Sequence, residues 1–177
     1  MDDLKNFFEL DCNSSYKIIP NITFSKLKIS TKSVYEMNCY SKNIKFFEFL
    51  ETEPHSDLDE TKDYMKSLVL REQNGSHGGD SLYWGITDAN SNELIGTIGL
   101  VGIKENYESA CTTMGLSMDY RNGGKAIEAT LSLLYYSFYV LNINKIWALT
   151  MEDNLAVIKL HELFGFNIKE IKEDYYE

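Results

Sequence analysis

Two adjacent glycines, Gly123 and Gly124, separate a strand-like stretch from a helix-like stretch. Residues 111–118 alternate as a strand does, and large apolar residues after the glycines recur at helical spacings of three and four. These are Ile127, Leu131, Leu134, Phe138 and Leu141. A helix starting here aims unpaired N–H groups and the positive end of its dipole at the turn, which suits a phosphate group. Glycine in such a turn can also serve the backbone conformation alone.

The remaining chain predicts strands and helices that alternate in a mixed α/β order. Strands are expected at 22–29, 81–89, 93–103, 110–118 and 145–151, and a last extended piece at 166–177. A first helix is expected at 30–40, with Ser30 or Thr31 as its cap, and a second runs from a capping box of Ser56 and Asp59 to about Glu72. A third helix is expected after the glycines, and a fourth from Asn154 to about Phe164. Residues 44–55 stay unassigned. The predicted fold class is α/β (α+β), with a mixed, mostly antiparallel central sheet flanked by helices.

The length, charge and cysteine spacing of the chain indicate a single domain and disfavour membrane, nucleic-acid-binding and metal-binding proteins. The 177 residues fit one domain at 22–177 behind an N-terminal leader at 1–21. No apolar run reaches the roughly 18 residues of a membrane span, and the acidic start lacks the order of a signal peptide, so we expect no membrane partner and a cytoplasmic protein. The net charge of −10 disfavours nucleic-acid binding and suits a cationic partner. The spacing of Cys12, Cys39 and Cys111 indicates no metal site.

Four stretches occur in an order typical of one superfamily. RNGGKA (121–126) fits a pattern of Arg or Gln, two free positions, Gly, one free position, then Gly or Ala. ELIGTIGL (93–100) is similar to a central strand, NLAVIKLHELFGF (154–166) to a later helix and turn, and ITFSKLKIS (22–30) to a first strand. Together they resemble the GCN5-related N-acetyltransferases (the GNAT superfamily), and within it the branch of the ribosomal-protein N-terminal acetyltransferases.

The resemblance implies that acetyl-CoA is the cosubstrate and that no metal is needed. Its pantetheine arm would lie along the strand residues Leu116, Ser117 and Met118. Its pyrophosphate would rest on the backbone amides of Asn122, Gly123, Gly124, Lys125 and Ala126. Arg121, Lys125 and Lys159 would supply positive potential, although each is equally well an ordinary surface residue. Asn154 would contact the pantetheine arm and also serve as a helix N-cap.

The resemblance also implies where the chemistry occurs. Many relatives protonate the leaving thiolate with a tyrosine seven residues after the asparagine, and His161 stands at that position here. Histidine can donate a proton near neutral pH, and a plain surface histidine is the alternative. Candidates for the base are Glu51, Glu53, His55 and Glu93, each of which fits an exposed residue better. Phe46, Phe47 and Phe49 would form either a wall of the acceptor cleft or part of the core.

The predicted function is transfer of an acetyl group from acetyl-CoA to a primary amine. Three acceptors compete: a protein N-terminus, a polyamine-like amine and an amino sugar on a nucleotide. A lysine-like amine needs about 4–5 kcal/mol to lose its proton at pH 7 and an α-amine about 1 kcal/mol, so an amine of low pKa is favoured. The alternative is a catalytically degenerate domain that binds CoA as a sensor or scaffold.

The position of Glu177 raises the question of how the sheet is completed. Members of the superfamily generally continue into one more strand after the position of Glu177. A missing strand leaves backbone groups of the sheet unpaired. Two explanations stay open: the final dozen residues take that place, or a second subunit covers the gap in a homodimer.

Overall fold

The computed structural model describes residues 21–50, 52–73, 80–121 and 123–171. In these residues, five strands form one sheet in the order β1-β2-β3-β4-β5. The strands are β1 (Ile22–Lys26), β2 (Leu82–Asp88), β3 (Leu94–Val101), β4 (Ser109–Leu116) and β5 (Lys145–Trp147). All neighbours are antiparallel except β4 and β5, which are parallel. The predicted mixed, mostly antiparallel sheet is confirmed, while the predicted leader lies outside the described residues except for Asn21.

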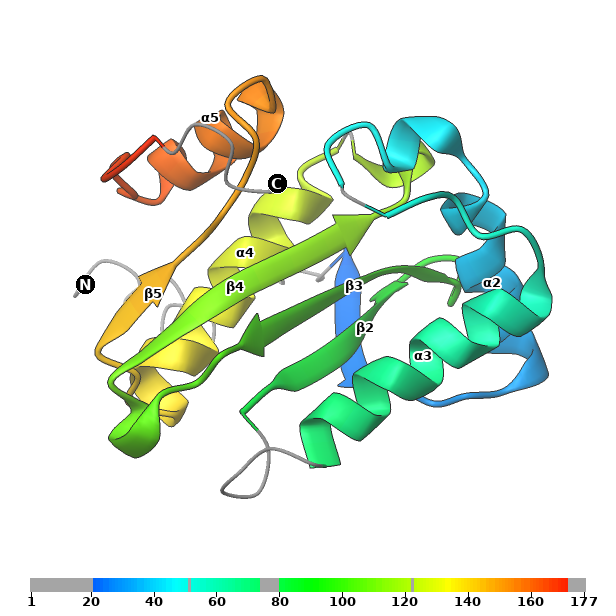
Figure 1. Cartoon of the computed structure of the whole chain (residues 1–177), viewed down its shortest axis with the longest axis horizontal. Coiled ribbons are helices and arrows are strands. Elements are labelled where there is room, and N and C mark those ends of the chain that lie inside the picture. Colours follow the sequence, from blue (N-terminus) through cyan, green and yellow to red (C-terminus); the bar gives the residue numbers. More distant parts are fainter. Residues whose placement is uncertain (1–20, 51, 74–79, 122, 172–177) are drawn as a thin grey trace, which may run out of the picture.

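Helices cover both faces of the sheet (Figure 1). On one side lie α2 (Thr31–Ser41) and α3 (Leu58–Gln73), and on the other lies α4 (Lys125–Tyr135), which continues into a π-helical turn, η4 (Tyr136–Val140). The last helix, α5 (Leu155–Leu163), stands apart from the sheet beyond β5 (Figure 1). Short 3-10 turns occupy η1 (Ile44–Phe46), η2 (Glu105–Tyr107) and η3 (Met118–Tyr120). No helix of the described residues is long and apolar enough to cross a membrane.

Each face of the sheet has its own core. Ile86 of β2 belongs to the core beneath α4, whereas a Cβ on its neighbour Gly85 would meet Leu94 and Leu27 at 2.8 and 3.5 Å on the other face. The core under α4 contains Ile22, Ile86, Ile95, Ile98, Leu100, Ala110, Leu116, Ala129, Leu133 and Ile143. The core under α2 and α3 contains Val34, Met37, Tyr40 and Met65. This alternation of faces along each strand fixes the register of the sheet.

The predicted apolar face of α4 and η4 is confirmed at Leu134 and Leu141 and corrected at Ile127. Ile127 was expected inside, but 44% of its surface is exposed. The buried residues are Ala129, Thr130, Leu133 and Leu134, followed by Ser137 of η4. Small side chains let the helix approach the sheet closely, and the pattern of large apolar residues did not reveal them.

The predicted cap of α2 is confirmed, and the predicted cap of α3 is corrected. The Ser30 hydroxyl accepts a hydrogen bond from the Ser33 N–H at 3.1 Å, so Ser30 caps α2 as expected. At α3 the predicted box of Ser56 and Asp59 is wrong. The Asp57 carboxylate instead accepts from the Glu60 N–H at 2.8 Å, and the Glu60 carboxylate accepts from the Ser56 N–H. The box is therefore shifted by one residue, and α3 begins at Leu58.

Several strand ends differ from their predictions. β1 stops at Lys26, three residues before the predicted end at residue 29. β4 ends at Leu116 because the chain turns into η3 at Met118. β5 ends at Trp147, because its three residues pair only with the first part of β4 before the chain diverges. Residues 166–171 form no strand, and the rest of that predicted piece lies outside the described residues.

Candidate active site

The sheet opens between β4 and β5. The two strands pair only at Ser109–Cys111 with Lys145–Trp147, and after Trp147 the chain turns away from β4 toward α5 (Figure 1). Among the described strands, none pairs with this side of β4 from Thr112 to Leu116. The Ser117 N–H donates to the Ile95 carbonyl at 2.8 Å, so by alternation the backbone groups of Met114 and Leu116 face the gap. The gap is thus bordered by backbone groups of β4 that pair with no described strand.

This free edge covers only part of the predicted pantetheine contact. Leu116 lies on it, and its carbonyl accepts from Arg121 Nε at 3.2 Å. The Ser117 N–H is already bound to β3, and Met118 begins the turn η3. The edge available to a ligand therefore runs earlier along β4 than the sequence predicted, and it includes Met114.

The glycine turn ends at the first turn of α4. Gly123 has φ +87° and Gly124 has φ +80°, a conformation that side chains with a Cβ disfavour. Gly124 is the N-cap of α4 and supplies no side chain to bond the first N–H groups of the helix. A Cβ at either glycine would meet nothing within 4 Å, so the space above the turn is open. Asn122, also predicted here, lies outside the described residues.

Two cations flank the turn in different ways. Arg121 is exposed, and its guanidinium group lies 5.9 Å from the centre of the Phe46 ring. The Lys125 ammonium group is turned inward and lies 2.5 Å from the Asp88 carboxylate, with both side chains nearly buried. Hydrogen bonds from Lys125 and from the backbone hold the pKa of Asp88 at about 2. Lys125 therefore offers an anion its backbone N–H rather than its charge.

One face of α5 is half-buried. That face carries Asn154, Val157, Ile158, His161 and Phe164, while Lys159 is exposed. Asn154 stands at the N-cap position, but its side chain makes no capping hydrogen bond, which corrects that prediction. Its amide donates instead to the Thr150 hydroxyl at 3.1 Å. Asn154 and His161 thus share one helix face, as the seven-residue spacing predicts.

The His161 ring has a defined orientation. Its Nδ1 lies 2.8 Å from the Val157 carbonyl, an acceptor, so Nδ1 carries a proton. The ring packs edge-on against Phe166, with 4.8 Å between the ring centres. The nitrogen that can exchange a proton with a ligand is therefore Nε2.

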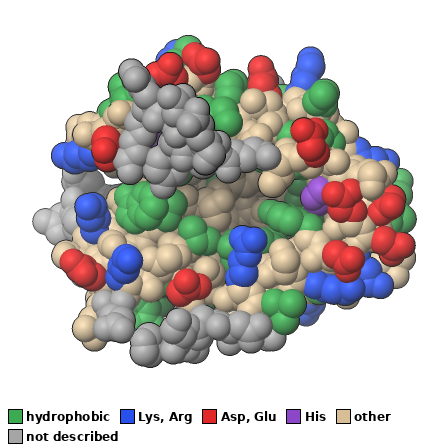
Figure 2. Space-filling model, in the orientation of Figure 1, with side chains coloured by type: hydrophobic (Ala, Val, Ile, Leu, Met, Phe, Trp, Pro, Cys, Tyr) green, Lys and Arg blue, Asp and Glu red, His purple; other side chains and the backbone are tan. Residues whose placement is uncertain are grey.

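An aromatic cluster covers the α2 and α3 side of β4. A Cβ on Gly115 would lie 2.9 Å from Phe46 Cζ, so the Phe46 ring rests on the strand at this point. Ring contacts continue from Phe46 to Phe47 at 5.1 Å and from Phe47 to His55 at 5.9 Å. Phe46 is half-buried, Phe47 is buried and Phe49 is half-buried. Figure 2 shows a hollow near the centre of this face of the molecule.

Of the base candidates that the structure describes, His55 is the buried one. Thr61 donates its hydroxyl proton to the Asp57 carbonyl, so His55 Nδ1, 3.0 Å from that hydroxyl, is the donor between them. Asn38 also donates to the Thr61 hydroxyl at 2.8 Å. Burial lowers the pKa of His55 below its ordinary value. The ring is therefore neutral near pH 7.

The predicted carboxylate bases are placed differently. Glu53 is exposed, and Glu51 lies outside the described residues. Glu93 accepts a hydrogen bond from the Tyr120 hydroxyl at 2.8 Å, which ties it to η3. The sequence analysis missed Tyr120 and Asp88 as supports of the glycine turn. Asp88 lies directly before the turn 89–91, and this position was a signal for its bonds to that turn. The sequence held no such signal for its pairing with Lys125.

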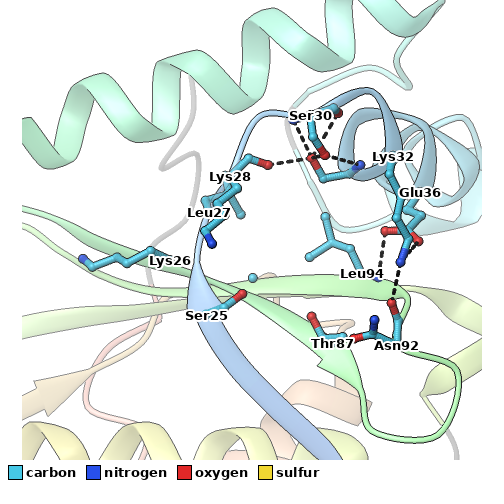
Figure 3. Close-up of a pocket in the computed structure, with 12 residues that line it drawn as sticks. Ser25, Lys26, Leu27, Lys28, Ser30, Lys32, Glu36, Thr87, Asn92 and Leu94 are labelled. Carbon is cyan, nitrogen blue, oxygen red and sulfur yellow. Dashed lines mark hydrogen bonds and ion pairs between the residues drawn. The ribbon is translucent and has the colours of Figure 1, made fainter.

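A separate pocket of about 180 Å³ lies between the end of β1, the start of α2 and the β2–β3 turn (Figure 3). Lys32 donates to the Asn92 carbonyl at 2.9 Å and lies 3.4 Å from the Glu36 carboxylate. Glu36 also accepts from the Leu94 N–H at 3.1 Å. These contacts join α2 to the β2–β3 hairpin, so the polar groups of the pocket serve the packing of the two elements. The β4 edge is therefore the better candidate site.

Comparison with known sequences identifies one domain family. A family model described as an acetyltransferase (GNAT) domain matches residues 22–167. The uncharacterized N-acetyltransferase YoaA of Bacillus subtilis (strain 168) is 28% identical over 92 residues, or 52% of this chain and 52% of that protein. The match thus spans about half the length of this curated relative.

Solved structures share the fold. A spermidine N-acetyltransferase from Vibrio cholerae, solved with CoA and spermine, has a TM-score of 0.68 at 21% identity, covering 85% of this chain and 83% of its own. A GCN5-related N-acetyltransferase from Brucella melitensis has a TM-score of 0.72 at 19% identity, covering 88% and 68%. A GNAT-family acetyltransferase from Bacillus anthracis has a TM-score of 0.68 at 16% identity, covering 82% and 80%.

Proposed function

The chain belongs to the acetyltransferase (GNAT) domain family, and from this premise we propose that it transfers the acetyl group of acetyl-CoA to a primary amine. The observation that carries the proposal is the unpaired edge of β4, which leads to the glycine turn at the start of α4. An extended ligand arm can pair with a strand edge, and a phosphate can rest on a helix N-terminus. Acetyl-CoA presents both groups in that order.

The cofactor is proposed to follow the edge of β4 toward α4. Its pantetheine arm pairs with the backbone of Met114 and Leu116, with Asn154 on the opposite side of the gap. Its pyrophosphate rests on the backbone N–H groups between residues 122 and 126, and Arg121 adds positive charge beside them. Charge-assisted hydrogen bonds contribute about 1.5–3 kcal/mol each, so several of them hold an anion even on an acidic protein.

The reaction forms a C–N bond and breaks a C–S bond. The neutral amine attacks the thioester carbonyl, the nitrogen loses a proton, and the departing thiolate gains one. We assign the second proton to His161. Since its Nδ1 proton is held by Val157, the donated proton comes from Nε2, and the ring acts in its doubly protonated form.

The acceptor is proposed to be an amine that deprotonates readily. Among the described groups, no carboxylate is buried beside the β4 edge as a strong base, so an amine of low pKa reacts at the lowest free-energy cost. A peptide α-amine and an amino sugar meet this condition. A polyamine is the competing acceptor for this chain, because a spermidine N-acetyltransferase shares its fold.

Thiol release from acetyl-CoA over a panel of amines tests the proposal. We expect free thiol with at least one of an N-terminal peptide, spermidine and an aminosugar nucleotide. The thermal stability of the protein with CoA is measured in parallel. Stabilisation by CoA without thiol release from any amine would favour the sensor or scaffold, and no stabilisation would contradict cofactor binding itself. Membership of the N-terminal acetyltransferase branch, a homodimer and a cytoplasmic location stay predictions.

A further inference from the structure

The β2–β3 turn is joined to the first residue of α4. Asp88 ends β2, and one of its carboxylate oxygens accepts from the N–H groups of Asn90 and Ser91 at 3.0 and 2.8 Å. The other oxygen lies 2.5 Å from the ammonium group of Lys125. The exposed fractions of the two side chains are 5% for Asp88 and 13% for Lys125, so the pair is largely withdrawn from water. The carboxylate thus connects the hairpin turn to the start of the helix.

The same turn holds the other side of the glycine loop. Glu93, at the far end of the turn, accepts a hydrogen bond from the Tyr120 hydroxyl at 2.8 Å. Tyr120 belongs to η3, directly before the glycine turn, and its ring centre lies 5.8 Å from the Lys125 ammonium group. Tyr120 and Lys125, on either side of the glycine turn, are therefore both held by residues that flank the β2–β3 turn.

A buried ion pair is a poor source of stability but a strong constraint on geometry. Bringing two charges out of water offsets most of their attraction, while removing one partner leaves a buried charge and is strongly destabilising. Asp88 supplies the charge that faces the Lys125 ammonium group, which also donates to the Asn21 carbonyl at 3.5 Å. Because Lys125 is the first residue of α4, these contacts fix where the first N–H groups of the helix lie.

We propose that Asp88 and Glu93 are positioning residues for acetyl-CoA: they hold the glycine turn in the shape that binds the pyrophosphate, without touching it. The proposal rests on the proposed function, since it needs the pyrophosphate at this turn. The charge of Asp88 is compensated by Lys125, and the Glu93 carboxylate is directed toward the Tyr120 hydroxyl.

The test is calorimetric titration of CoA into the wild type and the Asp88→Asn variant. Asparagine keeps an oxygen for the Asn90 and Ser91 N–H groups and removes the charge that faces Lys125. We expect the dissociation constant to rise about tenfold or more, because the unpaired ammonium group leaves its site and displaces the first turn of α4. In turnover, the KM for acetyl-CoA rises while kcat changes little, a split that general loss of folded protein does not produce.

Three further variants make the result decisive. Asp88→Asn/Lys125→Met removes both charges and is expected to recover most of the affinity that Asp88→Asn loses. Tyr120→Phe removes only the hydrogen bond to Glu93 and is expected to weaken CoA binding about two- to fivefold, which decides the matter if Asp88→Asn does not fold. Asp63→Asn breaks an exposed ion pair on α3 and serves as the control.

The outcomes separate the two proposals. A wild type that does not bind CoA contradicts the proposed function. A wild type that binds CoA, with Asp88→Asn or Tyr120→Phe binding it equally well or more tightly, contradicts the positioning role alone.

Discussion

At the scale of single residues, the hydrogen bond between His161 and the Val157 carbonyl decides how this histidine can act. With Nδ1 as the donor, a neutral ring has a bare Nε2 and can only accept a proton there. Donation to a thiolate thus requires the cationic ring. The same hydrogen bond and the contact with Phe166 restrict the ring to one orientation on the half-buried face of α5.

Replacement of His161 by alanine tests this assignment. We expect kcat to fall about 100-fold with little change in the KM for acetyl-CoA, because the proton donor is lost and the cofactor contacts remain. Steady-state kinetics with the best amine of the panel measures both constants. Glu162→Ala, which changes the exposed neighbour, is the control and should behave as the wild type. Intact turnover in His161→Ala would mean that water protonates the thiolate.

At the scale of elements, His55 holds the segment between α2 and α3. Its backbone N–H donates to the Ser41 carbonyl at 2.9 Å, and its ring donates to Thr61. Burial lowers its pKa in the folded state below the ordinary value of 6.5. The unfolded chain therefore binds a proton on this group at a higher pH than the folded chain does. The resulting contribution to stability is complete above pH 6.5 and is lost as the pH falls toward the folded-state pKa.

Urea unfolding at pH 7.5 and pH 5.5 measures that loss. We expect the wild type to be less stable at pH 5.5 and His55→Gln to show a smaller difference between the two values. Asp88 and Glu60 do not interfere, because their lowered pKa values confine their effects to more acidic solutions. An equal difference in the wild type and in His55→Gln would assign the pH dependence to other groups.

The elements themselves show what sequence patterns can predict. Local signals placed α2, the β2–β4 meander and α5 within a few residues, because caps, turns and alternation act over short distances. The apolar pattern of α4 included the buried Leu134 but missed Ala129 and Ser137, which pack by being small. The end of β5 was also misassigned, because the divergence from β4 after Trp147 depends on partners distant in the chain.

In the candidate site, too, the sequence predicted the locally determined feature and missed the one that depends on distant residues. The glycine turn was visible because Gly123 and Gly124 are needed for their positive φ angles, and a local pattern records that need. The ion pair of Asp88 with Lys125 joins residues 37 positions apart. No local pattern predicts such a pair, so a lysine expected to attract the anion is instead turned inward.

At the scale of the whole molecule, the scarcity of buried bases among the described residues points to the kind of amine accepted. We expect a peptide α-amine or an amino sugar to react faster than a lysine side chain, with rates that rise toward pH 8 to 9 as the amine deprotonates. The measurement is a pH–rate profile for an N-terminal peptide, spermidine, an aminosugar nucleotide and Nα-acetyl-lysine. A tenfold preference for spermidine or lysine at pH 7 would instead require a strong base, with Glu51, Glu53 and Glu93 the first residues to replace.

The most direct measurement of the central claim compares CoA binding in two glycine variants, Gly124→Val and Gly102→Val. Both glycines have positive φ angles, +80° and +59°, and neither Cβ would meet an atom within 4 Å, so in both variants the strain arises from the backbone conformation and not from a clash. Gly102 follows β3 at the end of the sheet opposite the glycine turn. We predict that calorimetry finds CoA binding sharply weakened in Gly124→Val and near the wild-type value in Gly102→Val. Unchanged CoA affinity in a folded Gly124→Val protein would contradict the assignment of the pyrophosphate to the start of α4.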